Sequence, residues 1–337
     1  MSSTIVASPE TTTARATTRI GLRFAIVGAV ALASAVLILT WGIGPAPGTR
    51  GFWLVVNMRV ITVATIAVVS VCQAVATVLF HTATGNRILT PSIMGFDALY
   101  VVMQTALVFF LGAHTFTQTD GLLKVAVQSL LMVTFATLLY SWLFSGRSGS
   151  LHTTLLVGII LGIGFGSLAA FMQRLLTPSE FDILSARLFG NLSNSNPEYL
   201  PWAALIIAAV GATVWQRRHR LDVLTLGRDA STGLGLNHRR EVLGILIITA
   251  VLISISTTMV GPMTFFGFIV ATLTYQLAGS SRHAVVLPFA ALLAMATLCT
   301  GYFVLRHVFY AAGMLSVIIE FAGGLFFLVY VLRKGSL

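Results

Sequence analysis

The sequence predicts an all-α membrane protein, and its composition, its long apolar runs and the placement of its basic residues all indicate this fold class. Hydrophobic residues make up 57% of the 337 residues and charged residues only 9%, whereas an ordinary soluble domain has roughly 25% charged residues. A helix needs about 20 mostly apolar residues to cross the hydrocarbon core of a bilayer. Ten runs meet or approach that length, so we expect ten transmembrane helices with both termini on one side of the membrane.

The ten runs follow one another within residues 20–337, which we treat as one transmembrane permease-like domain. They are Phe24–Trp41, Val60–Phe80, Ser92–Leu111, Leu122–Phe144, Leu155–Met172, Tyr199–Val214, Leu243–Val260, Met263–Leu277, Val285–Val304 and Met314–Leu332. Residues 1–19 are rich in Ser, Thr and Ala and are expected to form a disordered cytoplasmic tail. No cleavable signal is expected, because the first apolar run continues into a full-length span.

The basic residues set the orientation of these spans. If both termini face the cytoplasm, fourteen of the twenty Lys and Arg residues fall on the cytoplasmic side and six on the other. The six are Arg50, Arg59, Lys124, Arg174, Arg187 and Arg306. Because cytoplasmic loops carry an excess of Lys and Arg, both termini are predicted to be cytoplasmic. The net charge of +10 is then explained by membrane topology, and no nucleic-acid partner is expected.

The longest polar interruption between apolar runs is the loop of residues 215–241, which carries six of the twenty basic residues. Within it, LDVLTLG and DASTGLGL predict two short helical turns separated by Gly227, with Asp229 placed to cap the second. A charged and partly folded cytoplasmic loop indicates a docking surface for a soluble partner. A solvated loop that merely obeys the positive-inside rule is the alternative.

Two runs differ from plain lipid-facing helices. Gly158, Gly162 and Gly166 recur at a spacing of four, which lets another helix approach to backbone contact, either within the chain or from a second permease. The run Met263–Leu277 is short and follows Val-Gly-Pro, so we expect a broken or half-length segment. Broken backbone at membrane depth survives only where it is buried in protein or lines a cavity.

Asp97 and Glu320 are the two acids within the apolar runs. A charge at the centre of a membrane costs roughly 2.5–3.5 kcal/mol on insertion scales, so each marks either a packed, hydrogen-bonded position or a contact along a transport path. The seven histidines and two cysteines show no spacing typical of a metal site, and no set of residues indicates hydrolytic catalysis. We therefore expect no metal, no bound cofactor and no catalytic residue.

The sequence contains no Walker A loop, which needs the pattern G-x-x-x-x-G-K-[ST]. Its two lysines, Lys124 and Lys334, lie in other contexts. If transport through this chain consumes ATP, a separate subunit must bind ATP and Mg²⁺. An ion-coupled secondary transporter using Asp97 and Glu320 remains the alternative.

Four segments together resemble the FecCD-type permeases of bacterial ABC importers for iron-siderophores, haem and cobalamin. They are GNRILTPSIMGFDALY (residues 85–100), LTLGRDASTGLGLN (224–237), VGPMTFFGFIVATLTYQLAG (260–279) and FAGGLFFLVYVLRK (321–334). The resemblance implies a type II ABC importer permease with ten spans in the bacterial cytoplasmic membrane. It also implies three kinds of partner: ABC ATPase subunits, a second and non-identical permease, and a substrate-binding lipoprotein.

In that family the loop after the sixth span forms coupling helices that sit in a groove of the ATPase. The residues that carry over by match are Leu226, Gly227, Asp229, Leu234, Gly235 and Asn237, while Ser231 replaces the usual alanine. The glycine stripe would then line the path or the permease interface. Basic residues on the outer rim, here Arg59 and Arg306, would receive acidic residues of the binding protein.

The chain also departs from the family pattern. Only the first arginine of R-L-P-R remains, as Arg59, and Arg87 stands in place of the proline of N-P-L-A. Ala271-Thr272 replaces Pro-His, and AGMLSVI replaces E-L-P-V-G. The sequence of residues 86–100 is similar to that of the subgroup of permeases that serves catecholate siderophores. The resemblance thus implies import of a ferric-siderophore complex by alternating access.

Overall fold

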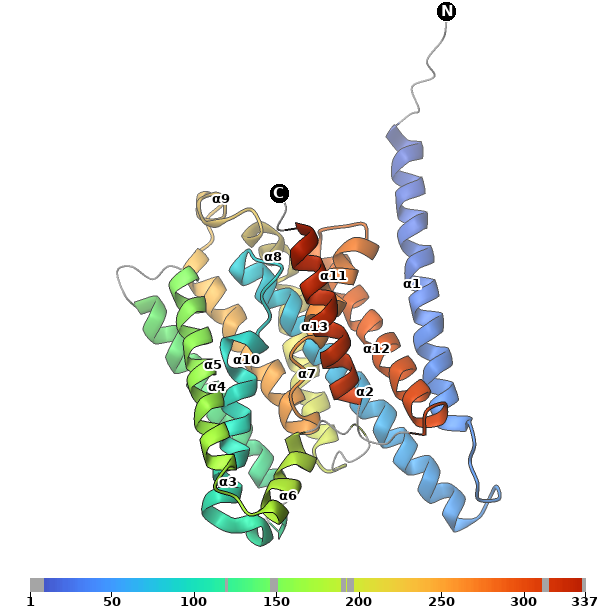
Figure 1. Ribbon diagram of the computed structural model, residues 1–337. Helices are drawn as coiled ribbons and strands as arrows, with labels where there is room; N and C mark the ends of the chain where they lie inside the picture. The colour runs from blue at the N-terminus through green and yellow to red at the C-terminus, as the bar shows by residue number, and fades with distance from the viewer. Residues whose placement is uncertain are drawn as a thin grey trace, which may run out of the picture.

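The computed structural model describes residues 9–118, 121–145, 151–188, 192, 197–310 and 315–334, and all regular structure in these ranges is helical. Figure 1 shows the helices gathered into one bundle. In chain order they are α1 (Pro9–Thr40), α2 (Arg50–Thr84), η1 (Ser92–Met94), α3 (Phe96–Gln118), α4 (Leu122–Ser145), α5 (Leu151–Gln173), α6 (Pro178–Leu188), α7 (Leu200–Gln216), α8 (Arg218–Leu224), α9 (Arg228–Gly233), α10 (His238–Val260), α11 (Phe266–Leu277), α12 (His283–His307) and α13 (Leu315–Lys334).

Six helices contain stretches long and apolar enough to cross a membrane, namely α1, α2, α4, α5, α10 and α12. Four shorter apolar helices, α3, α7, α11 and α13, account for the remaining apolar runs. Each of the ten predicted runs therefore contains a helix, whereas the count of ten spans stays a prediction. Residues 9–19, expected in a disordered tail, form the first turns of α1, and residues 1–8 lie outside the described part.

The core of the bundle is built around α2. This helix begins after Thr49, whose hydroxyl accepts a hydrogen bond from the Phe52 N–H at 3.3 Å. Beyond Thr62 most of its side chains are buried, and they pack against α10 and α12. Some of the polar side chains buried there are paired, as where Gln73 Nε2 donates to the Ser256 hydroxyl at 3.1 Å, whereas the buried Thr65 and Ser70 hydroxyls have no partner among the described residues. Each pair that forms offsets the cost of burying its polar groups.

The predicted broken segment is present between α10 and α11. Helix α10 ends at Val260, the next five residues are not helical, and α11 spans only Phe266–Leu277. The break follows from Gly261, whose φ of 82° is outside the helical region, and from Pro262, which has no N–H to continue the helix. Gly267 then lies so close to Thr77 of α2 that a Cβ atom there would overlap its hydroxyl.

The glycine stripe on α5 makes a close contact within the chain. A Cβ placed on Gly95, just after η1, would lie 3.0 Å from the Gly162 Cα and 3.2 Å from the Gly158 carbonyl oxygen. Gly158 in turn faces Met94. Gly166, one turn further along, has open space beside it. Two glycines of the stripe thus pack against η1, and the third faces away from this contact.

Candidate functional site

The 215–241 loop is folded. It carries α8 and α9, and Figure 1 shows both at the same end of the bundle as the beginning of α1 and the end of α13. Helix α8 contacts α2, α7 and α12, and it buries Leu221 and Leu224, each 3% exposed. The apolar face of α8 therefore fixes the loop to the ends of several long helices.

A buried polar contact adds to this attachment. The Asp222 carboxylate on α8 accepts hydrogen bonds from the backbone N–H of His283 at 2.8 Å and from its ring Nδ1 at 2.6 Å. The other ring nitrogen, Nε2, lies 2.7 Å from the Thr82 hydroxyl on α2. Because His283 is the first residue of α12, Asp222 caps that helix from a different segment. One histidine thus joins the loop to α12 and to the end of α2.

The start of α9 differs from the sequence prediction for Asp229. The N-cap residue is Gly227, with φ of 92°, so the helix begins at Arg228. Asp229 lies in the first turn instead of capping it, because Gly227, with its non-helical backbone, already occupies the N-cap position. In that position its carboxylate is favourable near the positive end of the helix dipole.

The end of α9 is closed by a Schellman motif. The Leu236 N–H donates to the Ser231 carbonyl at 3.0 Å, and the Gly235 N–H donates to the Thr232 carbonyl at 2.9 Å. Gly235 adopts φ of 85°, the left-handed conformation that this motif requires. Asn237 then caps α10, its side-chain oxygen accepting the Arg240 N–H at 3.1 Å. Two consecutive caps give the loop a defined shape.

Two large apolar side chains of this loop point away from the protein. Leu226 is 61% exposed and Leu234 is 64% exposed, whereas Ser231 between them is fully buried and lies 2.9 Å from His238 Nδ1. Glu241 accepts a hydrogen bond from Arg220 at 3.0 Å at the base of the loop. The loop therefore presents exposed leucines on a rigid support, which is typical of a surface that a partner covers.

Arg59 and Arg306 lie close enough together for their two positive charges to repel each other. In Figure 1 the start of α2 and the end of α12 lie at the end of the bundle opposite α8 and α9. Arg59 donates to the carbonyl oxygens of Ile38 at 3.0 Å and Trp41 at 2.7 Å, so it caps the end of α1. Arg306 donates to the Tyr302 hydroxyl at 3.1 Å. Both arginines thus have structural contacts within the chain.

The structure brings Asp97 and Glu320 together around Thr264, in the break between α10 and α11. The Thr264 hydroxyl donates to Asp97 Oδ2 at 2.9 Å, and the Thr264 backbone N–H hydrogen-bonds to Glu320. Asp97 is almost fully buried, and its second oxygen, Oδ1, has no partner among the described residues. Elsewhere in the described ranges no three His, Cys, Asp or Glu side chains are placed to hold a metal ion.

Some of these contacts leave no trace in the sequence pattern. Asp222 and His283 are separated by 61 positions, and neither lies in a motif that predicts their pairing. Thr264 was equally unmarked, although it lies two residues after Pro262 of the Gly-Pro that predicted the break. Gly235 and Asn237, in contrast, are residues whose types are typical of a helix C-terminus and an N-cap.

A bundle of apolar helices, with a broken segment in its interior and the folded 215–241 loop at one end, is the architecture of a multi-pass membrane permease. The chain belongs to the FecCD transport family, whose sequence model matches residues 25–334.

Two curated relatives and one solved structure are similar over most of the chain. The petrobactin import system permease protein FatC of Bacillus anthracis is 42% identical over 294 residues, covering 87% of this chain and 83% of the relative. YclO of Bacillus subtilis, with the same description, is 35% identical over 278 residues, covering 82% and 88%. A structure described as an inward-facing metal-chelate type ABC transporter has a TM-score of 0.73 at 20% identity, covering 93% of this chain and 99% of that one. This last likeness supports the fold.

Proposed function

We propose that the chain is the permease subunit of an ATP-driven importer that carries a ferric-siderophore complex across a bacterial cytoplasmic membrane. Membership of the FecCD transport family over residues 25–334 supports this most strongly. The sequence has no Walker A loop, so ATP and Mg²⁺ belong to separate ATPase subunits. In this proposal the chain is not itself an enzyme and binds no cofactor.

The 215–241 loop is the part proposed to receive force from the ATPase. Exposed Leu226 and Leu234 would enter a groove of that subunit, while Gly227, Asp229, Gly235 and Asn237 hold the two short helices in shape. The buried contacts of Leu221 and Leu224 and the bond from Asp222 to His283 make the loop continuous with α2 and α12. A displacement of the loop would therefore move those helices as well, which is what alternating access needs.

The substrate proposal follows the two relatives at 42% and 35% identity, which are both described as petrobactin import permeases. A petrobactin-type ferric complex is thus the first substrate to test. On the opposite face, Arg306 and Arg59 are proposed to receive acidic residues of a substrate-binding lipoprotein. Arginine has five N–H donors, so its contacts with α1 leave Arg59 further donors for this role.

A second, non-identical permease subunit is proposed to complete the path. Large apolar side chains on α5 and α13 are exposed in the single chain, among them Ile163 and Phe171 on α5 and Phe321 and Leu328 on α13. Lipid can cover some of them, but the open space beside Gly166 offers a close approach to another helix. Of the three glycines predicted to line the path or this interface, Gly158 and Gly162 are covered by η1 within the chain, so we assign Gly166 to the interface.

The test is uptake of iron-loaded petrobactin by cells that carry Leu226→Asp and Leu234→Asp together. A charge in an apolar groove prevents docking, so we expect uptake and co-purification of the ATPase to be lost while the permease stays in the membrane. Leu175→Asp is the matched control, because Leu175 is 57% exposed and lies between α5 and α6, at the end of the bundle where Figure 1 shows α6. Normal uptake in the double variant contradicts the coupling role.

One observation favours a second candidate, an ion-coupled secondary transporter. Asp97 and Glu320, far apart in sequence, meet at Thr264, and paired intramembrane carboxylates are typical of proton pathways. The two candidates differ in their energy source, which is ATP hydrolysis for the importer and an ion gradient for the secondary transporter.

A further inference from the structure

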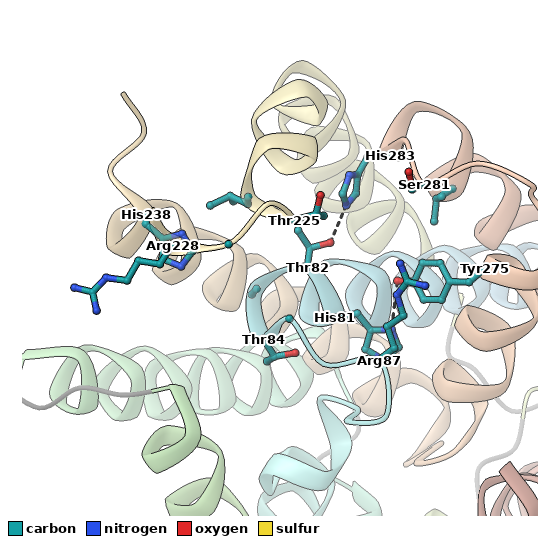
Figure 2. A pocket seen from close by; sticks show the side chains of 15 residues that line it. His81, Thr82, Thr84, Arg87, Thr225, Arg228, His238, Tyr275, Ser281 and His283 are labelled. Atoms are coloured by element: carbon teal, nitrogen blue, oxygen red, sulfur yellow. Dashed lines mark hydrogen bonds between the residues drawn. The ribbon is translucent and has the colours of Figure 1, made fainter. Parts of the chain in front are cut away.

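A polar cavity of about 410 Å³ lies between the 215–241 loop and the ends of the long helices. Figure 2 shows its lining from the end of α2, the end of α11, the start of α12 and the loop itself. The volume falls within the roughly 300–1,000 Å³ of small-molecule sites. Leu224, Gly227 and His283, which support the loop, form part of its wall, but the proposed coupling role involves no ligand bound in it.

The lining is basic. It includes two arginines and three histidines, and none of the lining residues described is acidic: Arg87, Arg228, His81, His238 and His283. The histidines already have partners, namely Tyr275 for His81, Ser231 for His238, and Asp222 with Thr82 for His283. The charge available to a ligand therefore comes from the two arginines.

Arg87 is the better placed of the two. Its guanidinium lies 4.4 Å from the centre of the Tyr275 ring, and Figure 2 shows the two side chains stacked beside the cavity. The Tyr275 hydroxyl is in turn 3.3 Å from His81 Nδ1, which fixes the ring. Arg228 extends away from this group in Figure 2 and stands at the rim. Neither arginine has a carboxylate partner in the described part of the chain.

Hydroxyl groups complete the site. Ser281 lines the same cavity, beside His283 at the start of α12, and its hydroxyl makes no hydrogen bond with any described residue. A planar guanidinium with free N–H donors and a hydroxyl on the wall of the same cavity form a donor set suited to phosphoryl oxygens. Arg87 stands where the N-P-L-A motif of the family has a proline.

We propose that this cavity binds a phosphoryl anion through Arg87, with Ser281 and Arg228 as further donors. Two sources share that chemistry. The cavity lies at the ends of α2, α11 and α12, on the side assigned to the cytoplasm, where basic pockets between membrane helices bind anionic lipid headgroups. Free phosphate from the cytosol is the other source.

The test measures binding by the full-length chain and needs no transport. Native mass spectrometry in a mixture of phosphatidylglycerol and phosphatidylcholine detects a retained lipid, and equilibrium binding of radiolabelled inorganic phosphate detects the free anion. We expect Arg87→Gln to weaken binding about tenfold or more, because a charge-assisted hydrogen bond is lost. Arg228→Gln is expected to weaken binding by a smaller factor.

Arg218→Gln is the matched control. Arg218 also stacks on an aromatic ring, with its guanidinium 4.8 Å from the centre of Trp215, but it does not line the cavity. Loss of phosphatidylglycerol retention in Arg87→Gln alone supports a lipid site, and loss of phosphate binding alone supports a free-anion site. If the wild-type chain binds neither probe, or if Arg87→Gln and Arg218→Gln bind equally well, the proposal is overturned. Uptake that fails for other reasons leaves these readouts unchanged.

Discussion

Asp222 is the residue on which the attachment of the 215–241 loop most depends. Its carboxylate accepts two hydrogen bonds from His283, whose side chain is only 4% exposed. A buried donor that loses its acceptor costs roughly 1–3 kcal/mol of folding free energy. Removing the Asp222 carboxylate should therefore destabilise the protein by more than the net contribution of two ordinary hydrogen bonds. The pair stabilises the start of α12 and transmits any motion of the loop to it.

We expect Asp222→Ala to lower the thermal stability of the purified chain, by about 1–3 kcal/mol per unsatisfied donor, and to reduce uptake. Thr225→Ala is the control: its hydroxyl donates to the Asp222 backbone carbonyl on the exposed face of the same loop. That control is expected to change stability by no more than about 0.5 kcal/mol. Melting curves of the two variants in one detergent make the comparison, and equal melting temperatures argue against the role of Asp222.

Residues in this site differ in how far sequence alone predicts them. Gly235 and Asn237 were identified through the match of residues 224–237 to the family motif, and the structure gives each a physical reason, a left-handed backbone at Gly235 and a capping oxygen on Asn237. Asp229 was assigned to the wrong position, since Gly227 already starts α9. The Asp222 contact with His283 could not be predicted, because it depends on how α8 packs against α12. Tertiary packing of that kind has no local pattern.

The short helix α9 owes its shape to its two ends. Six residues are too few to form a stable helix by propensity alone. The N-cap at Gly227 and the Schellman motif at Gly235 therefore fix where α9 begins and ends. Both glycines have positive φ, and neither has any atom within 4 Å of the position a Cβ would occupy. A substitution there is therefore strained by backbone conformation and not by crowding.

Gly235→Ala is expected to destabilise the loop by about 1–2 kcal/mol, the cost of a left-handed conformation for a residue with a Cβ. Gly233→Ala provides a matched control, because Gly233 lies inside α9 with helical backbone and equally open space. There alanine is expected to be neutral or to stabilise, by up to about 1 kcal/mol. Protease sensitivity of the loop and uptake measure both variants. If the two alanines behave alike, the φ argument is wrong.

The sequence predicted which helices are present better than it predicted where each helix begins and ends. Helix α2 spans Arg50–Thr84, well beyond the predicted run Val60–Phe80, because the turns that follow the Thr49 cap and the residues after Phe80 are also helical. Helix α6 was missed entirely, since eleven residues of mixed polarity show no apolar run. Thr177-Pro-Ser-Glu180 before it is a capping box and could have indicated it.

That capping box has a predictable dependence on pH. The Thr177 N–H and hydroxyl donate to Glu180 at 3.0 and 2.8 Å, and these bonds lower the pKa of the Glu180 carboxyl. A lowered pKa means that the stabilisation is present above the ordinary carboxyl range and is lost as pH falls through the lowered value. We expect the protection of the amides at the start of α6 against hydrogen exchange, relative to their intrinsic exchange rate at each pH, to fall in that acidic range, and Glu180→Gln to weaken the response. Unchanged protection there would contradict the cap.

Across the whole molecule, three groups of polar residues are spaced from one end of the bundle to the other. The 215–241 loop lies at one end, Arg59 and Arg306 at the other, and the acids around Thr264 lie within the interior. Such a series suits a permease that is driven from one face and supplied from the opposite face. It also suits a path along which protons move, so the arrangement alone does not identify the energy source.

Proteoliposomes that contain the permease with its ATPase, binding protein and second permease decide between the two. With ATP present and the proton gradient collapsed by a protonophore, we expect uptake of the iron complex to continue at its former rate. Vanadate, which blocks ATPases, should stop it.

Asp97→Asn and Glu320→Gln sharpen that comparison, because each amide keeps an oxygen that can accept the bond from Thr264 but can no longer release a proton. If the acids serve packing, uptake in both variants should stay within about twofold of wild type, a change in barrier well below 1 kcal/mol. Proton-coupled transport instead requires that either substitution abolish uptake and that the protonophore do the same. The buried Asp97, held by Thr264 at the start of α3, favours the packing outcome, since its bond to Thr264 already provides a structural reason for its presence.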